Sequence, residues 1–95
     1  MIVERKTWKV KQGCMQETVA LGKSFAETVG TTWRFYTGNV GPHDTLVGEH
    51  EWESLAEREK LWAELRARPD WPAFVEKWLA LTERGGYTEI WDLVE

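Results

Sequence analysis

Two carboxylates stand two residues apart in the stretch TLVGEHEW, at Glu49 and Glu51. Alternate residues of a strand point to the same face of a sheet, about 7 Å apart along the strand. When two such carboxylates are buried, at least one pKa rises, which is how a general acid or base is made. The same pair equally suits a solvated sheet edge, or ion pairs with Arg5 and Arg34, and the structural interpretation is favoured.

Strand alternation predicts that Arg5, Arg34 and Tyr36 lie on that same face. Two guanidinium groups and a phenol suit a small anionic or enolic ligand, because guanidinium binds carboxylates in a bidentate manner. The alternative is that these side chains bridge two copies of the chain and bind no ligand. In both interpretations Arg5 and Arg34 should flank the two glutamates from neighbouring strands.

Three further residues are candidates for a site. His50 should share the opposite face with Trp52, where a lone histidine is more often a hydrogen-bonded core residue than a ligand. His43 falls in the loop GNVGPHD at 38–44, and Trp91 is an aromatic candidate in the last strand. The sequence has no metal-ligand cluster, glycine-rich phosphate loop or Ser/His/Asp signature, so neither a metal nor a cofactor is expected.

The composition is ordinary for a soluble globular protein, with 42% hydrophobic and 29% charged residues. A length of 95 residues predicts one domain, over residues 1–95. The net charge of −4, without a separate basic run, argues against nucleic acid or an anionic membrane as the main partner. The single cysteine permits no internal disulfide, and neither a bilayer-spanning run nor a signal peptide is visible, so a cytoplasmic location is expected.

Hydrophobic periodicity, together with glycine and proline breaks, predicts four strands and three helices. Strands are expected over Ile2–Lys11, over Thr31–Thr37, from Thr45 to the helix cap Ser54, and over Tyr87–Val94. Helices are expected over Met15–Val29, over Leu55–Arg66, and from an Asp70 N-cap to Gly85-Gly86. Gly22 interrupts the apolar stripe of the first helix, which indicates a close approach of helix and sheet.

The order strand, helix, strand, strand, broken helix, strand is the βαββαβ pattern of ferredoxin-like folds. It predicts an α+β fold with a four-stranded antiparallel sheet, helices on one face, and a second helix broken in two at Pro69. No helix remains for the other face, which would carry Tyr36, Val47 and Trp91. An uncovered face of this kind predicts a homodimer in which two sheets pack together as a barrel.

Seven tryptophans are spread over the predicted elements. This spread favours core and interface roles over stacking on sugars or bases, because large aromatic side chains dominate such contacts. Trp52 should be buried between sheet and helices, and the second and third helices offer Leu61, Trp62, Phe74 and Trp78 to meet it.

Several residues together form a loose pattern along the chain. They are Arg5, Trp8 and Gly13 in and after the first strand, the 38–44 turn, Trp52 before Ser54-Leu55 and Arg58, and Trp71 at a helix opening. In this pattern the chain resembles NIPSNAP-like domains of the dimeric α/β-barrel superfamily, over nearly its whole length. The resemblance implies the fold and dimerisation. It implies little about activity, because members of that superfamily do unrelated things.

Haem-degrading monooxygenases of the same superfamily offer a test of one activity. Their pattern has an Asn in the first strand, a Trp on the following helix, and a His farther along as haem ligand. Trp62 is in place for the Trp, but the first strand has no Asn and residues 63–74 contain no His. Because the axial ligand is indispensable, haem is not expected.

Two functions are therefore considered. The first is a small-molecule binding or interaction module, acting as a homodimeric barrel with a polar pocket. The second is a cofactor-independent monooxygenase or cyclase/isomerase acting on a small polar aromatic or enolic compound. An enclosed pocket with an apolar base and a carboxylate or His of shifted pKa would favour the enzyme. A pocket filled by its own paired side chains would favour the first function.

Overall fold

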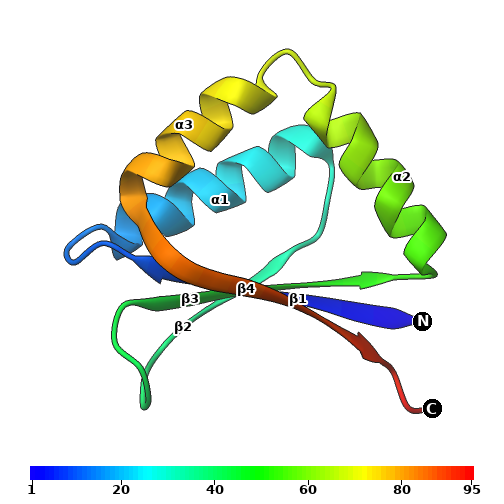
Figure 1. The fold of residues 1–95 in the computed structure, drawn as a ribbon, viewed down its shortest axis with the longest axis horizontal. Coiled ribbons are helices and arrows are strands. Elements are labelled where there is room, and N and C mark those ends of the chain that lie inside the picture. The colour runs from blue at the N-terminus through cyan, green and yellow to red at the C-terminus, as the bar shows by residue number, and fades with distance from the viewer.

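The computed structural model describes all residues from Met1 to Glu95. The elements follow in the order β1 (Ile2–Val10), α1 (Met15–Val29), β2 (Arg34–Thr37), β3 (Thr45–Trp52), α2 (Leu55–Arg66), α3 (Trp71–Leu81) and β4 (Thr82–Asp92). All strand pairs are antiparallel, and the sheet order is β2-β3-β1-β4. The three helices lie on one face of the sheet, and no helix covers the other (Figure 1). The predicted α+β fold with a four-stranded antiparallel sheet is confirmed.

The largest departure from the predicted elements lies where α3 meets β4. The sequence predicted a helix as far as Gly85-Gly86, but α3 ends at Leu81 and β4 begins at Thr82. Gly85 has a φ of +105°, and the β1–β4 register shifts between Thr7 and Lys9. The glycine pair therefore marks a β-bulge inside the strand, a role that such a pair fills as readily as a helix end.

The two crossover helices begin in different ways. For α2 the capping prediction is confirmed, since Ser54 Oγ accepts a hydrogen bond from the Glu57 amide at 3.2 Å. Asp70 occupies the N-cap position of α3, but its carboxylate makes no cap hydrogen bond. It instead accepts hydrogen bonds from Arg68 Nε and Nη2 at 2.9 and 3.1 Å. The backbone of Asp70 is helical, with φ −87° and ψ −6°, whereas a capping residue usually has an extended backbone, which accounts for the missing cap hydrogen bond.

The core between sheet and helices is small. Leu46 is fully buried, and Trp52 is 3% exposed, so the predicted burial of Trp52 is confirmed. Gly22 and Gly48 let aromatic rings approach the backbone. A Cβ at Gly22 would lie 3.2 Å from the Phe35 ring, and a Cβ at Gly48 would lie 3.1 Å from the Trp8 ring. The predicted close approach at Gly22 is thus observed. None of the three helices is long and apolar enough to cross a bilayer.

Candidate functional site

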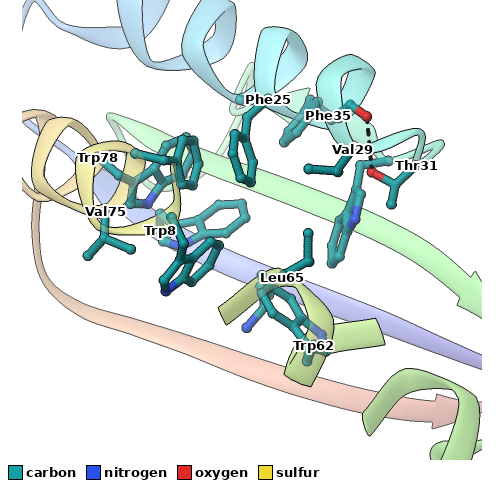
Figure 2. Close-up of a pocket in the computed structure, with 15 residues that line it drawn as sticks. Trp8, Phe25, Val29, Thr31, Phe35, Trp62, Leu65, Val75 and Trp78 are labelled. Atoms are coloured by element: carbon teal, nitrogen blue, oxygen red, sulfur yellow. Dashed lines mark hydrogen bonds between the residues drawn. The ribbon is translucent and has the colours of Figure 1, made fainter. Parts of the chain in front are cut away.

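A cavity of about 270 Å³ lies between the sheet and the three helices (Figure 2). Twelve of its fifteen lining residues are hydrophobic. The lining consists of Lys6, Trp8, Gly22, Phe25, Ala26, Val29, Thr31, Trp33, Phe35, Trp62, Leu65, Trp71, Phe74, Val75 and Trp78. Every helix and two strands contribute side chains to this wall, so the cavity exists only once the whole fold has formed.

Aromatic rings form much of the cavity wall, and five of the seven tryptophans belong to it. Trp8 and Trp78 meet edge to face, with ring centroids 4.9 Å apart. Phe25 and Phe74 stack with centroids 4.0 Å apart. Rings held in such contacts present rigid apolar surfaces, which suit a ligand that is itself flat and apolar.

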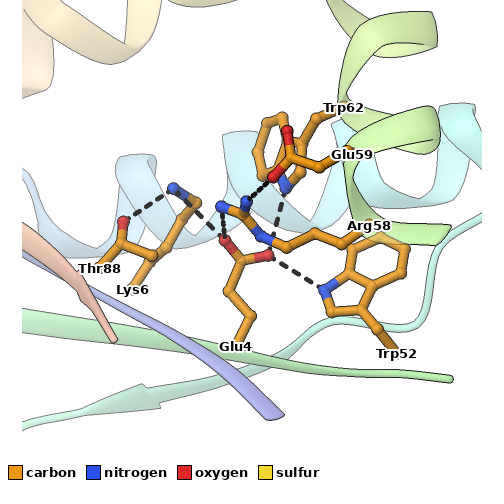
Figure 3. A network of polar contacts seen from close by, with 7 residues as sticks. All are labelled: Glu4, Lys6, Trp52, Arg58, Glu59, Trp62 and Thr88. Carbon is orange, nitrogen blue, oxygen red and sulfur yellow. Dashed lines mark hydrogen bonds and ion pairs between the residues drawn. The ribbon is translucent and has the colours of Figure 1, made fainter. Parts of the chain in front are cut away.

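A wholly buried carboxylate, Glu4, contacts two residues of the cavity lining (Figure 3). Its Oε2 accepts a hydrogen bond from Arg58 at 2.6 Å and lies 3.7 Å from Lys6 Nζ. Its Oε1 accepts hydrogen bonds from the indole N–H groups of Trp52 and Trp62 at 3.1 and 3.2 Å. Burial alone would raise the pKa of Glu4, but these donors and charges outweigh it and lower the pKa. Glu4 is therefore ionised, and its oxygens are occupied.

Lys6 connects this buried cluster to the cavity. Its Nζ donates a hydrogen bond to Thr88 Oγ1 at 3.0 Å and lies 4.9 Å from the centre of the Trp62 ring. Burial lowers the pKa of Lys6; the Glu4 carboxylate opposes this shift and the charge of Arg58 adds to it. Lys6 is the only ionisable side chain among the lining residues.

The polar residues singled out in the sequence lie on the opposite, helix-free face of the sheet. Arg5 Nε lies 2.7 Å from Glu49, and Arg34 Nη2 lies 3.4 Å from Glu49 and 3.6 Å from Glu51. The strand register places Arg34, Glu49, Arg5 and Glu89 side by side across all four strands. We call these four residues the ionic row. Its charges alternate in sign, so each has an opposite charge on a neighbouring strand.

Aromatic residues lie on either side of the ionic row on this face. Tyr36 is two residues along β2 from Arg34, and hydrogen bonding with Tyr36 and then Glu49 raises the pKa of Arg34. In the register of β4 with β1, Trp91 lies opposite Val3 and Tyr87 lies opposite Thr7, on the same face as Arg5. The exposed fractions of Tyr36, Tyr87 and Trp91 are 47%, 58% and 52%. The face thus combines paired charges with uncovered rings.

Neither histidine lines the cavity or belongs to the ionic row. His50 is on the helix side of β3. Its ring meets the Trp52 ring edge to face, with centroids 4.2 Å apart, and stacks on the Trp33 ring, with centroids 5.4 Å apart. Its Nδ1 is buried without a hydrogen-bond partner, and burial lowers the pKa of the imidazole. His43 is exposed in the β2–β3 loop. No three side chains of His, Cys, Asp or Glu gather closely enough to hold a metal ion.

Sequence reasoning missed the cavity and the cluster of Glu4, Lys6 and Arg58. A signal was present for all three residues. Glu4 and Lys6 alternate with the residues of the polar face and therefore share the face of Trp8, which points to the helices. Arg58 lies at helical spacing from Leu61, Trp62 and Leu65, which form the inward side of α2. Charged residues on faces that should be apolar indicate a buried ion pair.

Several solved structures are similar to this chain. A protein from Agrobacterium tumefaciens has a similar structure, with a TM-score of 0.87 and 21% identity over 99% of this chain and 94% of that one. An uncharacterised NIPSNAP domain protein from Burkholderia xenovorans gives a TM-score of 0.86 and 17% identity, over 99% and 95%. The structure of an antibiotic biosynthesis monooxygenase gives a TM-score of 0.73 and 15% identity, over 100% of both chains. At these identities the similarities show the fold alone.

No protein with a curated description matches the sequence. The family model named NIPSNAP, however, matches residues 3–85, which is most of the chain. The resemblance seen in the sequence is therefore confirmed, and the chain belongs to the NIPSNAP family.

Proposed function

We propose that this NIPSNAP chain is a small-molecule-binding domain whose ligand lies in the cavity between sheet and helices. The cavity itself is the observation that carries the proposal: its 270 Å³ are left open by the chain's own side chains. Ligand sites in proteins span about 300–1,000 Å³ and are mostly apolar with a few polar groups. At about 270 Å³ this cavity lies just below that range, so it suits a compact ligand of about two fused rings.

The proposal includes a homodimer formed through the helix-free face. Exposed aromatic rings on a sheet face that no helix covers support it, because such patches mark interaction surfaces. The ionic row also fits an interface. Glu49 is already in contact with both Arg5 and Arg34, so its charge would enter the interface with partners in place. In this proposal the polar residues of the sequence prediction stabilise the dimer, and the ligand binds on the other side of the sheet.

Binding in the cavity is tested with 2-naphthamide, a neutral two-ring compound. We expect it to raise the melting temperature of the wild-type protein, because a ligand that binds only the native state stabilises it. Ala26→Phe should abolish the shift, since Ala26 lines the cavity and the added ring would fill it. Ala20→Phe, on the exposed side of α1, is the matched control. A shift that persists in Ala26→Phe places the ligand elsewhere, and no shift in the wild type contradicts the proposal.

Dimerisation is tested by analytical ultracentrifugation. We expect a dimer at micromolar concentration, with a total buried area above about 1,000 Å², where specific interfaces begin. Glu49→Gln should weaken it at least tenfold, because two arginines lose their shared counter-charge at the interface. Glu64→Gln, on the exposed side of α2, is the control. A wild-type monomer would refute this part. An intact dimer that loses ligand binding in Glu49→Gln or Arg34→Met would instead place the ligand on the polar face.

A second candidate is a cofactor-independent monooxygenase or isomerase acting on an enolic compound in the same cavity. The structural similarity to an antibiotic biosynthesis monooxygenase favours it, although at 15% identity that similarity concerns the fold. Binding without reaction is better supported, because the oxygens of Glu4 are occupied and cannot act as a free base. Oxygen uptake with 1,4-dihydroxynaphthalene that exceeds the buffer rate and disappears in Ala26→Phe would favour the enzyme.

A further inference from the structure

Building on the proposed function, we propose that the cavity takes a ring-containing apolar acid. Such a ligand carries one negative charge, as a carboxylate, phenolate or enolate. Its rings would lie among the aromatic side chains of the wall, and its charged oxygen would meet Lys6 Nζ. This assignment names the chemical class of the ligand and gives the site a residue that selects it.

The first support is the position of Lys6. It is the only charged residue in a lining that is otherwise almost entirely apolar. The hydroxyl of Thr31 has no donor left for an anion, since it donates its hydrogen to the Ala26 carbonyl at 3.4 Å. A polar ligand group therefore has one place in the cavity where a charged partner is available.

The second support is the number of hydrogen-bond donors on Lys6. A lysine ammonium carries three N–H donors and no acceptor. One donor is taken by Thr88 Oγ1 at 3.0 Å. The distance of 3.7 Å to the Glu4 carboxylate is that of an ion pair and exceeds hydrogen-bond length. The ammonium group therefore keeps donor capacity for a further acceptor beside it.

The third support is the charge of the buried cluster. Glu4 carries one negative charge, whereas Lys6 and Arg58 carry two positive charges. The carboxylate lies 2.6 Å from Arg58 and 3.7 Å from Lys6, so its closer partner is the arginine. Glu59 also pairs with Arg58, but its side chain is 62% exposed, and water and salt screen its charge. One positive charge is left over, and it lies at the cavity.

Charge balance also limits the ligand to one anionic group. Burial lowers the pKa of Lys6 even though Glu4 is nearby, so the ammonium lacks full compensation for its lost hydration. One anion on the ligand would supply that compensation. A second anion would be buried in an apolar wall without a partner, which is costly.

The experiment compares 2-naphthoate with 2-naphthamide, two compounds of the same rings that differ in charge. By isothermal titration calorimetry, the wild-type protein should bind the naphthoate about tenfold or more tightly, because charge-assisted hydrogen bonds are the stronger ones. Lys6→Met should lose this preference and keep the affinity for 2-naphthamide. Lys9→Met, in the same strand but exposed, is the matched control and should keep the preference.

The outcomes separate this inference from the proposed function. Equal wild-type affinity for the two compounds overturns the inference and leaves the binding function standing, as does a preference that persists in Lys6→Met. If neither compound binds the wild-type protein, the proposed function fails and the inference fails with it. The wild-type comparison does not require any variant to fold. Should Lys6→Met unfold, Lys6→Gln keeps a polar side chain beside Glu4 and serves in its place.

Discussion

Replacing Glu4 with leucine should lower the free energy of unfolding by about 3–5 kcal/mol, the usual cost of removing one partner from a buried ion pair. The carboxylate is fully buried and receives hydrogen bonds from Arg58, Trp52 and Trp62. Without it, the ammonium group of Lys6 loses its counter-charge, the guanidinium of Arg58 keeps only the exposed Glu59, and two indole N–H groups lose their acceptor. Urea unfolding at neutral pH, followed by tryptophan fluorescence, measures the loss.

A double variant separates the lost ion pair from the lost packing. Glu4→Leu combined with Arg58→Met should be more stable than Glu4→Leu alone, because the unpaired arginine is then removed as well. If Glu4→Leu costs less than about 1 kcal/mol, the value of an ordinary exposed ion pair, then Glu4 is not a buried anchor.

The same residue predicts a pH dependence. The pKa of Glu4 in the folded protein is lower than its ordinary value of 4.5. The contribution of its charge to stability is therefore fully present above the unfolded-state pKa and is lost as the pH falls through the folded-state pKa. Wild-type stability should fall more steeply below about pH 4.5 than that of Glu4→Gln, which has no carboxylate to protonate. Parallel curves for the two proteins would contradict the assignment.

The faces of the strands could be predicted from the sequence, because alternation is a local property of an extended chain. It correctly put Trp52 on the helix side and Arg5 with Glu49 on the other. The ionic row needed one further step, the order of the strands. That order follows from the βαββαβ pattern. Only Glu89 of the row was missed: it lies within the predicted strand Tyr87–Val94, but its place beside Arg5 depends on the β1–β4 register.

The cavity and the buried cluster could not be predicted in the same way. A cavity is the space left between rings that come from several elements, and no local pattern encodes it. Glu4 and Arg58 are 54 positions apart, and they meet only because α2 presents its inner stripe to β1. Alternation and helical spacing placed both residues on inward faces, but how α2 sits on the sheet depends on packing. The sequence therefore predicted a candidate ligand site on the polar face, and did not indicate the cavity on the apolar side.

Trp52→Ala should lower the free energy of unfolding by about 3–5 kcal/mol, as large-to-small aromatic changes in cores do. The side chain is 3% exposed, and its ring centroid lies 4.2 Å from that of His50. Its indole N–H donates a hydrogen bond to Glu4 at 3.1 Å. The change therefore removes both core packing and one hydrogen bond to the buried carboxylate of Glu4. Trp52→Phe keeps a ring and loses the N–H, so it should cost clearly less. Urea unfolding of the three proteins measures both differences.

Trp91→Ala provides the contrast, because it makes the same change at a side chain that is 52% exposed on the helix-free face. In the proposed dimer this ring is covered by the second copy, so its removal should weaken association. The measured destabilisation should therefore depend on protein concentration, as it does for any change that acts through subunit association. The loss caused by Trp52→Ala should lie in the fold of each subunit and persist after dilution to the monomer. A melting temperature that hardly changes in Trp52→Ala would mean that the two faces of β3 are inverted, and that His50 points to the helix-free side of the sheet.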